Sequence, residues 1–266
     1  MSALYHEVHG SGEEGDLVLL HGWSLNLRVW DGLVRALAPR FRVIAIDLPG
    51  HGRSDWDPRA VTPAAQAWRV HETLAPLTER YTLLGWSLGG QLALDLAAAL
   101  PAGVERLALI ATTPKFLKAP NWRCGTPRPL LARLVHRLHS EGERAVSDFL
   151  ALLARGSAPG TAARVRAKLR AALRTHGGAR PEALTAGLAR LRDGDLRKAL
   201  PMVRVPVLVI AGERDRIIRP AASRALAAAL PDAHYVEVAG AAHAPFLSHP
   251  VQFTRQRTGF LGEGAS

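Results

Sequence analysis

The sequence has 266 residues, of which 48% are hydrophobic and 21% charged, which suits one sizeable core or a core with a modest insertion. Its one cysteine, Cys124, excludes an internal disulfide and a cysteine-based zinc site, and we expect neither a metal nor a cofactor. No apolar run approaches the roughly 18 residues that span a bilayer, and the N-terminus lacks the pattern of a signal peptide, so we expect a cytoplasmic protein.

The formal net charge of +11 is concentrated in one internal stretch. Residues 115–198 contain 18 Lys and Arg against 6 Asp and Glu, a balance of +12, whereas the rest of the chain has a balance of −1. Such asymmetry favours an acidic partner or substrate. A solvated helical surface would explain the same pattern without any partner.

In chain order, short apolar runs predict strands at residues 4–9, 17–20, 41–46, 81–84, 104–111, 205–211 and 235–238. Helices are expected between them, at residues 26–38, 62–77, 91–100, 220–230 and 251–261. Asn26 can cap the first of these helices, and Thr62-Pro63 is typical of a helix start. Strands that alternate with helices predict an α/β fold with a mainly parallel sheet, flanked by helices on both faces.

One long interval breaks this alternation. Residues 127–139, 141–154, 161–174 and 180–191 have helical spacing of apolar residues, with no convincing strand. We therefore divide the chain into a core of residues 1–114 and 200–266 and an inserted, all-helical and strongly basic lid of residues 115–199. Because the insertion follows a strand, it is expected over the carboxyl edge of the sheet, where such sheets bind ligands.

The strand at 81–84 runs into Gly85-Trp86-Ser87-Leu88-Gly89, the pattern of a nucleophile elbow. In that motif a sharp turn strains the backbone of the central serine, and the glycines on either side remove Cβ atoms that would clash. A chance match is expected in roughly one such chain in ten, but it would rarely fall between an apolar strand and an Ala-rich helix. The motif predicts that Ser87 is a nucleophile.

A serine nucleophile needs a base, and the base needs an acid that orients it. Asp215 follows the strand at 205–211 and His243 follows the strand at 235–238, so both are expected at the carboxyl edge with Ser87. The order Ser, acid, His therefore predicts a catalytic triad of Ser87, Asp215 and His243. The other candidates are Glu213 on the same loop as Asp215, His249, which is expected to help start the final helix, and His234, which is expected to be exposed.

The reaction of such a triad also generates an oxyanion, which needs N–H donors held in place. The backbone N–H of Leu88, directly after the nucleophile, is one predicted donor. The other is the backbone N–H of Trp23, in the loop after the strand at 17–20, and the Trp23 indole can line the acyl pocket as well. Asp47 and Arg53 are expected to organise a turn rather than perform chemistry.

These residues resemble the α/β-hydrolase superfamily over nearly the whole chain. Within it, three stretches resemble the pimeloyl-[acyl-carrier protein] methyl ester esterases of biotin synthesis: Leu19-Leu-His-Gly-Trp-Ser-Leu-Asn26, Leu84-Gly-Trp-Ser-Leu-Gly-Gly90 and Ala241-Ala-His-Ala-Pro-Phe-Leu-Ser-His-Pro250. The stretch Phe149-Leu-Ala-Leu-Leu153 is similar to the substrate-lining segment of that family.

The resemblance implies an α/β-hydrolase fold and a serine carboxylesterase that hydrolyses the methyl ester of pimeloyl-[acyl-carrier protein]. It implies substrate contacts from Trp23, Ser87, Leu88, Phe149, Leu150, Ala151, Leu152, Leu153 and His243. Since acyl carrier proteins are acidic, it also implies docking of the carrier on basic residues of the lid. The nearest matches are Arg144, Arg155, Arg164, Arg166, Lys168 and Arg170.

Three alternatives remain open. A general short-chain carboxylesterase would share the triad, because the triad fixes the reaction and not the acyl chain. A hydrolase-like binding protein would retain the triad without turnover. The third is nucleic-acid binding by the basic lid, but the lid lacks an aromatic-interleaved basic motif, so we expect no nucleic-acid partner. We also expect a monomer that does not bind a membrane. Haloalkane dehalogenases and epoxide hydrolases use an aspartate where this chain has Ser87.

Overall fold

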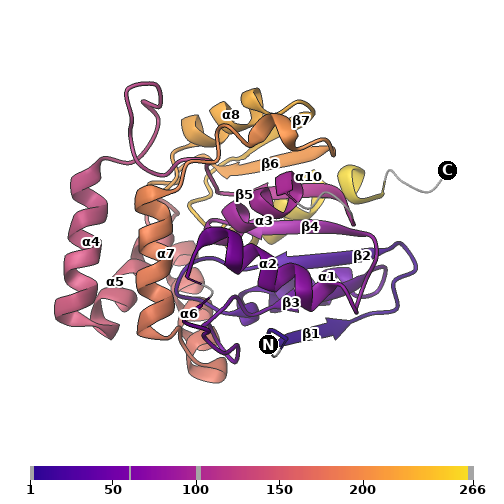
Figure 1. Cartoon of the computed structure of the whole chain (residues 1–266), viewed down its shortest axis with the longest axis horizontal. Coiled ribbons are helices and arrows are strands. Elements are labelled where there is room, and N and C mark those ends of the chain that lie inside the picture. The colour runs from indigo at the N-terminus through magenta and orange to yellow at the C-terminus, as the bar shows by residue number, and fades with distance from the viewer. Residues whose placement is uncertain (1–2, 60, 100–102, 263–266) are drawn as a thin grey trace.

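The protein is built around one seven-stranded sheet (Figure 1). The structure, a computed structural model, describes residues 3–59, 61–99 and 103–262, so Leu100, the predicted end of one helix, lies outside the described residues. The strand order is β1-β3-β2-β4-β5-β6-β7, and every pairing is parallel except that of β1 with β3. The strands are β1 (His6–His9), β2 (Asp16–Leu20), β3 (Arg42–Ile46), β4 (Tyr81–Trp86), β5 (Val104–Ile110), β6 (Val207–Gly212) and β7 (Ala233–Val238).

Helices cover both faces of the sheet, which explains why β4 and β6 are buried along their whole length. Every residue of β4 and of β6 is buried, as a parallel sheet between two helical layers requires. One face packs against α1 (Asp31–Leu37) and α10 (Pro250–Gly262), and the other against α2 (Pro63–Leu74), α3 (Leu88–Ala99) and α8 (Pro220–Ala229). The short helices η1 (Leu27–Trp30), η2 (Leu200–Met202) and α9 (Pro245–Ser248) complete the core.

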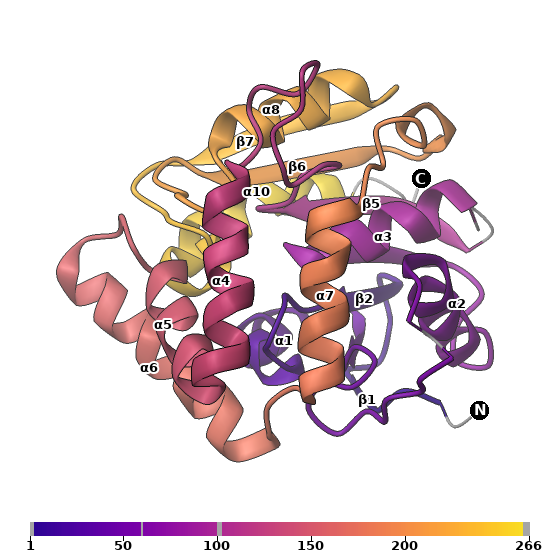
Figure 2. The same ribbon diagram turned by 60° about the vertical axis from the view of Figure 1, so that its left-hand side comes forward.

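Four helices lie between β5 and β6, as the apolar spacing predicted. They are α4 (Arg128–Glu141), α5 (Glu143–Leu153), α6 (Pro159–His176) and α7 (Pro181–Asp193), called here the helical segment. Figure 1 shows them gathered at one end of the sheet, and Figure 2 brings α4 and α7 forward, side by side. That end holds the carboxyl termini of the parallel strands. Whether this segment acts as a lid stays a prediction.

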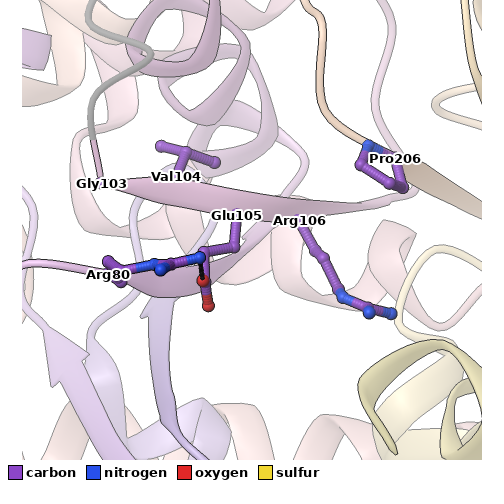
Figure 3. A pocket seen from close by; sticks show the side chains of 6 residues that line it. All are labelled: Arg80, Gly103, Val104, Glu105, Arg106 and Pro206. Carbon is purple, nitrogen blue, oxygen red and sulfur yellow. Dashed lines mark ion pairs between the residues drawn. The ribbon is translucent and has the colours of Figure 1, made fainter. Parts of the chain in front are cut away.

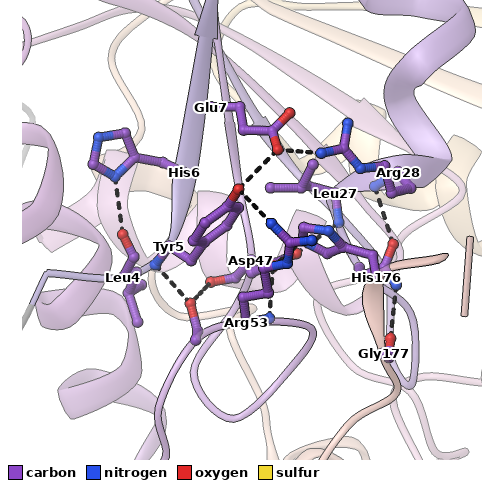
Figure 4. Close-up of polar contacts among 12 residues, drawn as sticks. Leu4, Tyr5, His6, Glu7, Leu27, Arg28, Asp47, Arg53, His176 and Gly177 are labelled. Carbon is purple, nitrogen blue, oxygen red and sulfur yellow. Dashed lines mark hydrogen bonds and ion pairs between the residues drawn. The ribbon is translucent and has the colours of Figure 1, made fainter.

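The helical segment is tied to the core near the end of α6 (Figure 4). The Asn26 side-chain amide donates hydrogen bonds to the carbonyls of Ala172, at 2.9 Å, and Gly177, at 2.8 Å. His176 Nε2 lies 2.7 Å from Asp47 Oδ2, and both side chains are fully buried. Burial raises the pKa of the Asp47 carboxyl, although hydrogen bonds to the carboxylate oppose that rise. Buried polar links of this kind hold the end of α6 in one position.

The helix starts at Asn26 and Thr62 and the position of His234 follow the predicted pattern in part. Thr62 caps α2 as predicted, since its hydroxyl accepts a hydrogen bond from the Ala65 amide at 3.2 Å. Asn26 caps a helix start by accepting from the Arg28 amide, but the first turn is the 3₁₀ helix η1 and α1 follows it. His234 is exposed as predicted, yet it lies within β7 and not before it.

In the described residues, none of the helices combines the length and the apolar character that crossing a membrane requires.

Candidate active site

The turn after β4 has the strained geometry of a nucleophile elbow. Ser87 has a φ of +55°, which a residue with a side chain rarely adopts, and its amide donates to the Ile110 carbonyl at 2.9 Å. A Cβ on Gly85 would lie 2.5 Å from the Gly89 carbonyl oxygen, and one on Gly89 would lie 2.4 Å from that of Leu20. Only glycine fits at both positions, at Gly85 because the turn itself is tight and at Gly89 because the end of β2 comes close.

The structure brings together the three predicted triad side chains. Ser87 Oγ lies 3.0 Å from His243 Nε2, and His243 Nδ1 lies 2.7 Å from Asp215 Oδ2. The other carboxylate oxygen of Asp215 accepts from the amides of Ile217, at 2.8 Å, and Ile218, at 3.0 Å. Because a carboxylate can only accept, Nδ1 of His243 carries its proton and Nε2 is free to accept the proton of Ser87.

The backbone of His243 is held from two sides. Its carbonyl accepts a hydrogen bond from the Trp86 indole at 2.8 Å, and the two rings lie 5.7 Å apart. Its amide donates to the Leu153 carbonyl, at the end of α5, at 3.2 Å. His243 is 1% exposed, whereas Ser87 is half-buried and therefore reachable. The imidazole thus sits at the junction of the core and the helical segment.

The predicted oxyanion donors lie at the point where the strand order reverses. The chain passes from β2 to β3 on one side and then crosses to β4 on the other side of β2, so the loops after β2 and β4 are neighbours. Sheets of this kind bind ligands in the crevice at such a point. Trp23 follows β2 and Leu88 follows Ser87, and neither backbone N–H has a hydrogen-bond acceptor among the described residues. Both amides are therefore available to an oxyanion.

The Trp23 side chain is buried beneath the helical segment. Its indole N–H donates to the Leu184 carbonyl of α7 at 2.9 Å, and its ring stands perpendicular to that of Phe149 of α5, with 4.9 Å between the centroids. Edge-to-face packing at this distance is a favourable aromatic geometry. The residue that carries one predicted oxyanion donor is therefore held by α5 and α7.

A cavity of about 790 Å³ lies among the four helices of the helical segment. Its apolar wall comes from all four helices and from the loop before α7: Leu138, Val146, Leu150, Leu173, Ala179, Pro181 and Leu184. Polar and charged side chains also line it: Ser24, His139, Glu143, Ser147, Arg170, Arg174 and Thr185. Its size and its apolar side chains suit a flexible chain, and Ser24, next to Trp23, is the point at which its lining comes nearest to the triad, since neither Ser87 nor His243 lines it.

The substrate-lining run predicted at residues 149–153 is divided by the helix that carries it. Leu150 lines the cavity, Phe149 packs on Trp23, and the Leu153 carbonyl holds His243. Ala151 and Leu152 instead line a separate hollow of about 340 Å³. Successive residues of an α-helix point about 100° apart, so five consecutive residues cannot face one cavity. The structure does not bring Ala151 and Leu152 to the cavity.

The six predicted docking residues do not share one face either. Arg144 is on α5, Arg155 follows α5, and the other four are on α6. At about 100° per residue, Arg164 and Lys168 lie on one side of α6 and Arg166 and Arg170 lie nearly opposite. Of the six, Arg170 lines the main cavity, together with Arg174, which the sequence did not single out. Arg155 and Arg166 line the separate hollow that Ala151 and Leu152 also line. Lys168 lines another hollow, beside α1 and α10.

The competing candidates have structural roles. The Glu213 carboxylate is exposed and accepts from the Gly240 amide at 2.7 Å, away from His243. His249 lies between α9 and α10, with Nδ1 2.9 Å from Ser248 Oγ, which agrees with a role at the start of the final helix. The Arg53 amide donates to Asp47 at 2.9 Å, so these two residues organise a turn as predicted.

Two buried histidines support the loop that leads to Trp23, and the sequence did not single them out. His21 Nδ1 donates to the Gly22 carbonyl at 2.8 Å, and Nε2 accepts from the Leu48 amide at 3.0 Å. Burial lowers the pKa of His21 well below its usual value and that of His51, 5.3 Å from it, to about 4. Both rings are therefore neutral at pH 7. The Leu-His-Gly pattern before Trp23 was the available signal for His21.

Another pocket, of about 430 Å³, lies at the amino ends of β5 and β6 (Figure 3). Ser87 follows the carboxyl end of β4, so this pocket is at the opposite end of the strands. Its charged side chains are already engaged: Arg80 pairs with Glu105 at 2.5 Å, and Arg106 donates to the Phe260 carbonyl at 2.6 Å. It holds no nucleophile beside a base. The described residues also contain no group of three or more His, Cys, Asp or Glu side chains placed to bind a metal ion.

Comparisons with known proteins agree with this geometry. Residues 17–256 match the alpha/beta hydrolase family. The chain is 42% identical to the pimeloyl-[acyl-carrier protein] methyl ester esterase of Xanthomonas oryzae pv. oryzae (strain MAFF 311018), over 97% of this chain and 98% of that protein. It is 39% identical to the esterase of the same name from Nitrosomonas europaea, over 95% and 97% of the two chains.

Among solved structures, a hydrolase from Pseudomonas aeruginosa PA01 superposes with a TM-score of 0.81 and 30% identity, over 97% of this chain and 93% of that one. The match to the family spans most of the chain, and the alignments to the two named esterases cover nearly the full length of those proteins. The chain therefore belongs to the alpha/beta hydrolase family, and it is a carboxylic ester hydrolase.

Proposed function

We propose that this enzyme hydrolyses the methyl ester of pimeloyl-[acyl-carrier protein], releasing methanol and the free carboxylate while the acyl chain stays on its carrier. The observation that carries the substrate is the 42% identity, over almost the whole of both chains, to an esterase named for that compound. The observation that carries the reaction is the hydrogen-bonded series from Ser87 through His243 to Asp215. By the same resemblance the step belongs to biotin synthesis.

In the proposed acylation, Ser87 Oγ attacks the ester carbonyl carbon while its proton passes to His243 Nε2. The negative charge that develops on the carbonyl oxygen is stabilised by the backbone N–H groups of Trp23 and Leu88. Asp215 stabilises the imidazolium and keeps its ring oriented, without taking the proton itself. Collapse of the tetrahedral intermediate breaks the bond to the methoxy oxygen, which leaves as methanol with the proton from His243.

Deacylation repeats these steps with water. His243 Nε2 takes a proton from the water, whose oxygen attacks the acyl carbon attached to Ser87. The same two N–H groups stabilise the second oxyanion. The intermediate then expels Ser87 Oγ, which recovers its proton from His243, and the free carboxylate leaves.

The shape and charge of the helical segment support a carrier-linked substrate. The cavity has an apolar wall for a methylene chain, and Arg170 and Arg174 add positive charge to its lining. Both side chains are exposed, so they can meet an acidic carrier at the surface. Such charges favour encounter and orientation more than they add affinity. The cytoplasmic location and the monomeric state stay predictions.

The direct test compares substrates on the purified enzyme. We expect kcat/KM for pimeloyl-carrier methyl ester to exceed that for free short-chain methyl esters, and both activities to disappear in Ser87→Ala with the fold intact. Failure on the carrier-linked compound, together with fast cleavage of unrelated esters, would favour a general carboxylesterase. Turnover that survives in Ser87→Ala would refute the proposed chemistry.

Charge reversal on the two sides of α6 tests the docking of the carrier. Arg170→Glu with Arg174→Glu changes the charge by the same amount as Arg164→Glu with Lys168→Glu, on the same helix. We expect the first pair to reduce kcat/KM for the carrier-linked ester more than the second, and a free methyl ester to be nearly unaffected by the second. Equal losses of kcat/KM in the two double variants would indicate only a long-range effect of charge. Equal losses on the carrier-linked and the free ester would contradict docking of the carrier.

A further inference from the structure

Ser24 carries two unfavourable features that a glycine at the same position would avoid. Its backbone has a φ of +65°, in the left-handed region that disfavours residues with a Cβ. Its hydroxyl is buried, with the residue 1% exposed, and has no hydrogen-bond partner. Unpaired buried polar groups are rare in folded proteins, and strained residues gather at ligand-binding and catalytic sites.

The position of Ser24 connects these features to the cavity. It follows Trp23 directly, and in the described part of the chain it is the one residue of the cavity wall that comes from outside the helical segment. Besides Ser24, the wall has seven apolar side chains and six polar or charged ones. Of the other two hydroxyl groups on the wall, that of Thr185 already donates to the Pro181 carbonyl at 2.9 Å, and Ser147 is only half-buried, so its hydroxyl is not forced to lack a partner. Ser24 therefore offers an unused donor where the cavity approaches the catalytic loops.

We propose that Ser24 is a specificity-determining residue whose hydroxyl, after rotation about its Cα–Cβ bond, donates a hydrogen bond to a carbonyl oxygen that the substrate carries beyond the reacting ester. This inference rests on the proposed function, in which the cavity holds an acyl chain. This hydrogen bond from Ser24 selects acyl chains that carry a second carbonyl group over simple fatty acyl chains. That carbonyl can belong to the far end of the chain or to an amide of the arm that links it to the carrier.

The test uses three methyl esters: methyl heptanoate, which has no second carbonyl, dimethyl pimelate, which has one on the chain, and the N-acetylcysteamine thioester of monomethyl pimelate, which adds an amide. The quantity measured is the ratio of kcat/KM for each dicarbonyl ester to that for methyl heptanoate, with dimethyl pimelate corrected for its two equivalent ends. We expect Ser24→Ala to lower that ratio by about tenfold, the equivalent of about 1.4 kcal/mol. Ser140→Ala, which removes an exposed hydroxyl on α4, is the matched control and should leave the ratio unchanged.

Thermal unfolding supplies a second readout. Because Ser24→Gly removes both the strain and the unpaired hydroxyl, it should raise Tm by about 2–4 °C while lowering the ratio as Ser24→Ala does. A fall with the thioester alone assigns the bond to the arm, and a fall with both dicarbonyl esters assigns it to the chain. An unchanged ratio in both variants overturns the inference, even where Ser87→Ala still abolishes turnover and the esterase function stands.

Discussion

Gly187→Ala should impair catalysis although residue 187 lies outside the triad. In α7, the missing Cβ of Gly187 leaves room for the two residues whose amides are the proposed oxyanion donors. An ideal Cβ there would lie 2.5 Å from Trp23 Cδ1, 3.0 Å from Trp23 Nε1 and 3.3 Å from Leu88 Cδ2. The helix therefore contacts the side chains of both residues whose amides are the proposed donors, and a single methyl group would push against them.

The expected magnitude follows from these distances. Carbon atoms pack at about 3.5–4.0 Å, so Trp23 or α7 must shift by about 1 Å to accept the methyl group. A displacement of about 1 Å can cost about 10²-fold in rate, and loss of one oxyanion donor costs about 10²–10³-fold. Overpacking costs about 1–3 kcal/mol of stability, offset by about 0.5–1 kcal/mol from replacing glycine in a helix. We expect kcat to fall about 10²-fold in a protein that still folds.

The assay measures kcat and KM on a short-chain methyl ester, with active-site titration to count folded enzyme. The affinity of a trifluoromethyl ketone, whose adduct with Ser87 places an oxyanion in the hole, should fall in parallel. Gly160→Ala is the matched control, since a Cβ at this helical glycine of α6 meets nothing within 4 Å. A wild-type kcat in folded Gly187→Ala, or a loss explained wholly by unfolding, would refute the reasoning.

Three further outcomes are expected. Asp215→Asn should lower kcat by about 10⁴-fold with little change in Tm, because the imidazole loses its partner for the cationic state; a smaller loss than about tenfold would contradict the triad. His176→Ala should cost about 1–3 kcal/mol in urea unfolding, because the buried Asp47 carboxylate loses one of its hydrogen bonds, and a cost below about 0.5 kcal/mol would refute a buried link. Since the pKa of His51 is lowered from 6.5 to about 4, its stability contribution is complete above pH 6.5 and is lost as pH falls towards 4, at about 1.4 kcal/mol per unit. His51→Gln should flatten that slope, and an unchanged slope would contradict a neutral buried ring.

Sequence patterns identified the local features of the fold well because their causes are local. Apolar runs marked the buried strands, and Thr62-Pro63 marked the start of α2. Gly85 reports a turn so tight that no Cβ fits, and that constraint lies within five residues, whereas a Cβ on Gly89 would meet the Leu20 carbonyl at the end of β2. The order of the loops after β6 and β7 then placed Asp215 and His243 at the same edge.

The contacts of the helical segment could not be predicted, because they join residues far apart in the chain. Asp47 meets His176 and Trp23 meets Leu184, and neither partner carries a local signal. The run at 149–153 shows a second limit, since a linear stretch reads as one surface while a helix turns its members in different directions. Ser24 was read only as part of a motif, because its backbone angle and its unpaired hydroxyl are properties of the folded chain.

Labelling with a fluorophosphonate, followed by intact-protein and peptide mass spectrometry, tests the central claim that Ser87 forms the covalent acyl-enzyme. The account predicts one label per chain, on Ser87, and a loss of activity in proportion to labelling. Pimeloyl-carrier methyl ester should slow the labelling, because it competes for the same serine. A label on another residue, or labelled enzyme that still hydrolyses the ester, would contradict it.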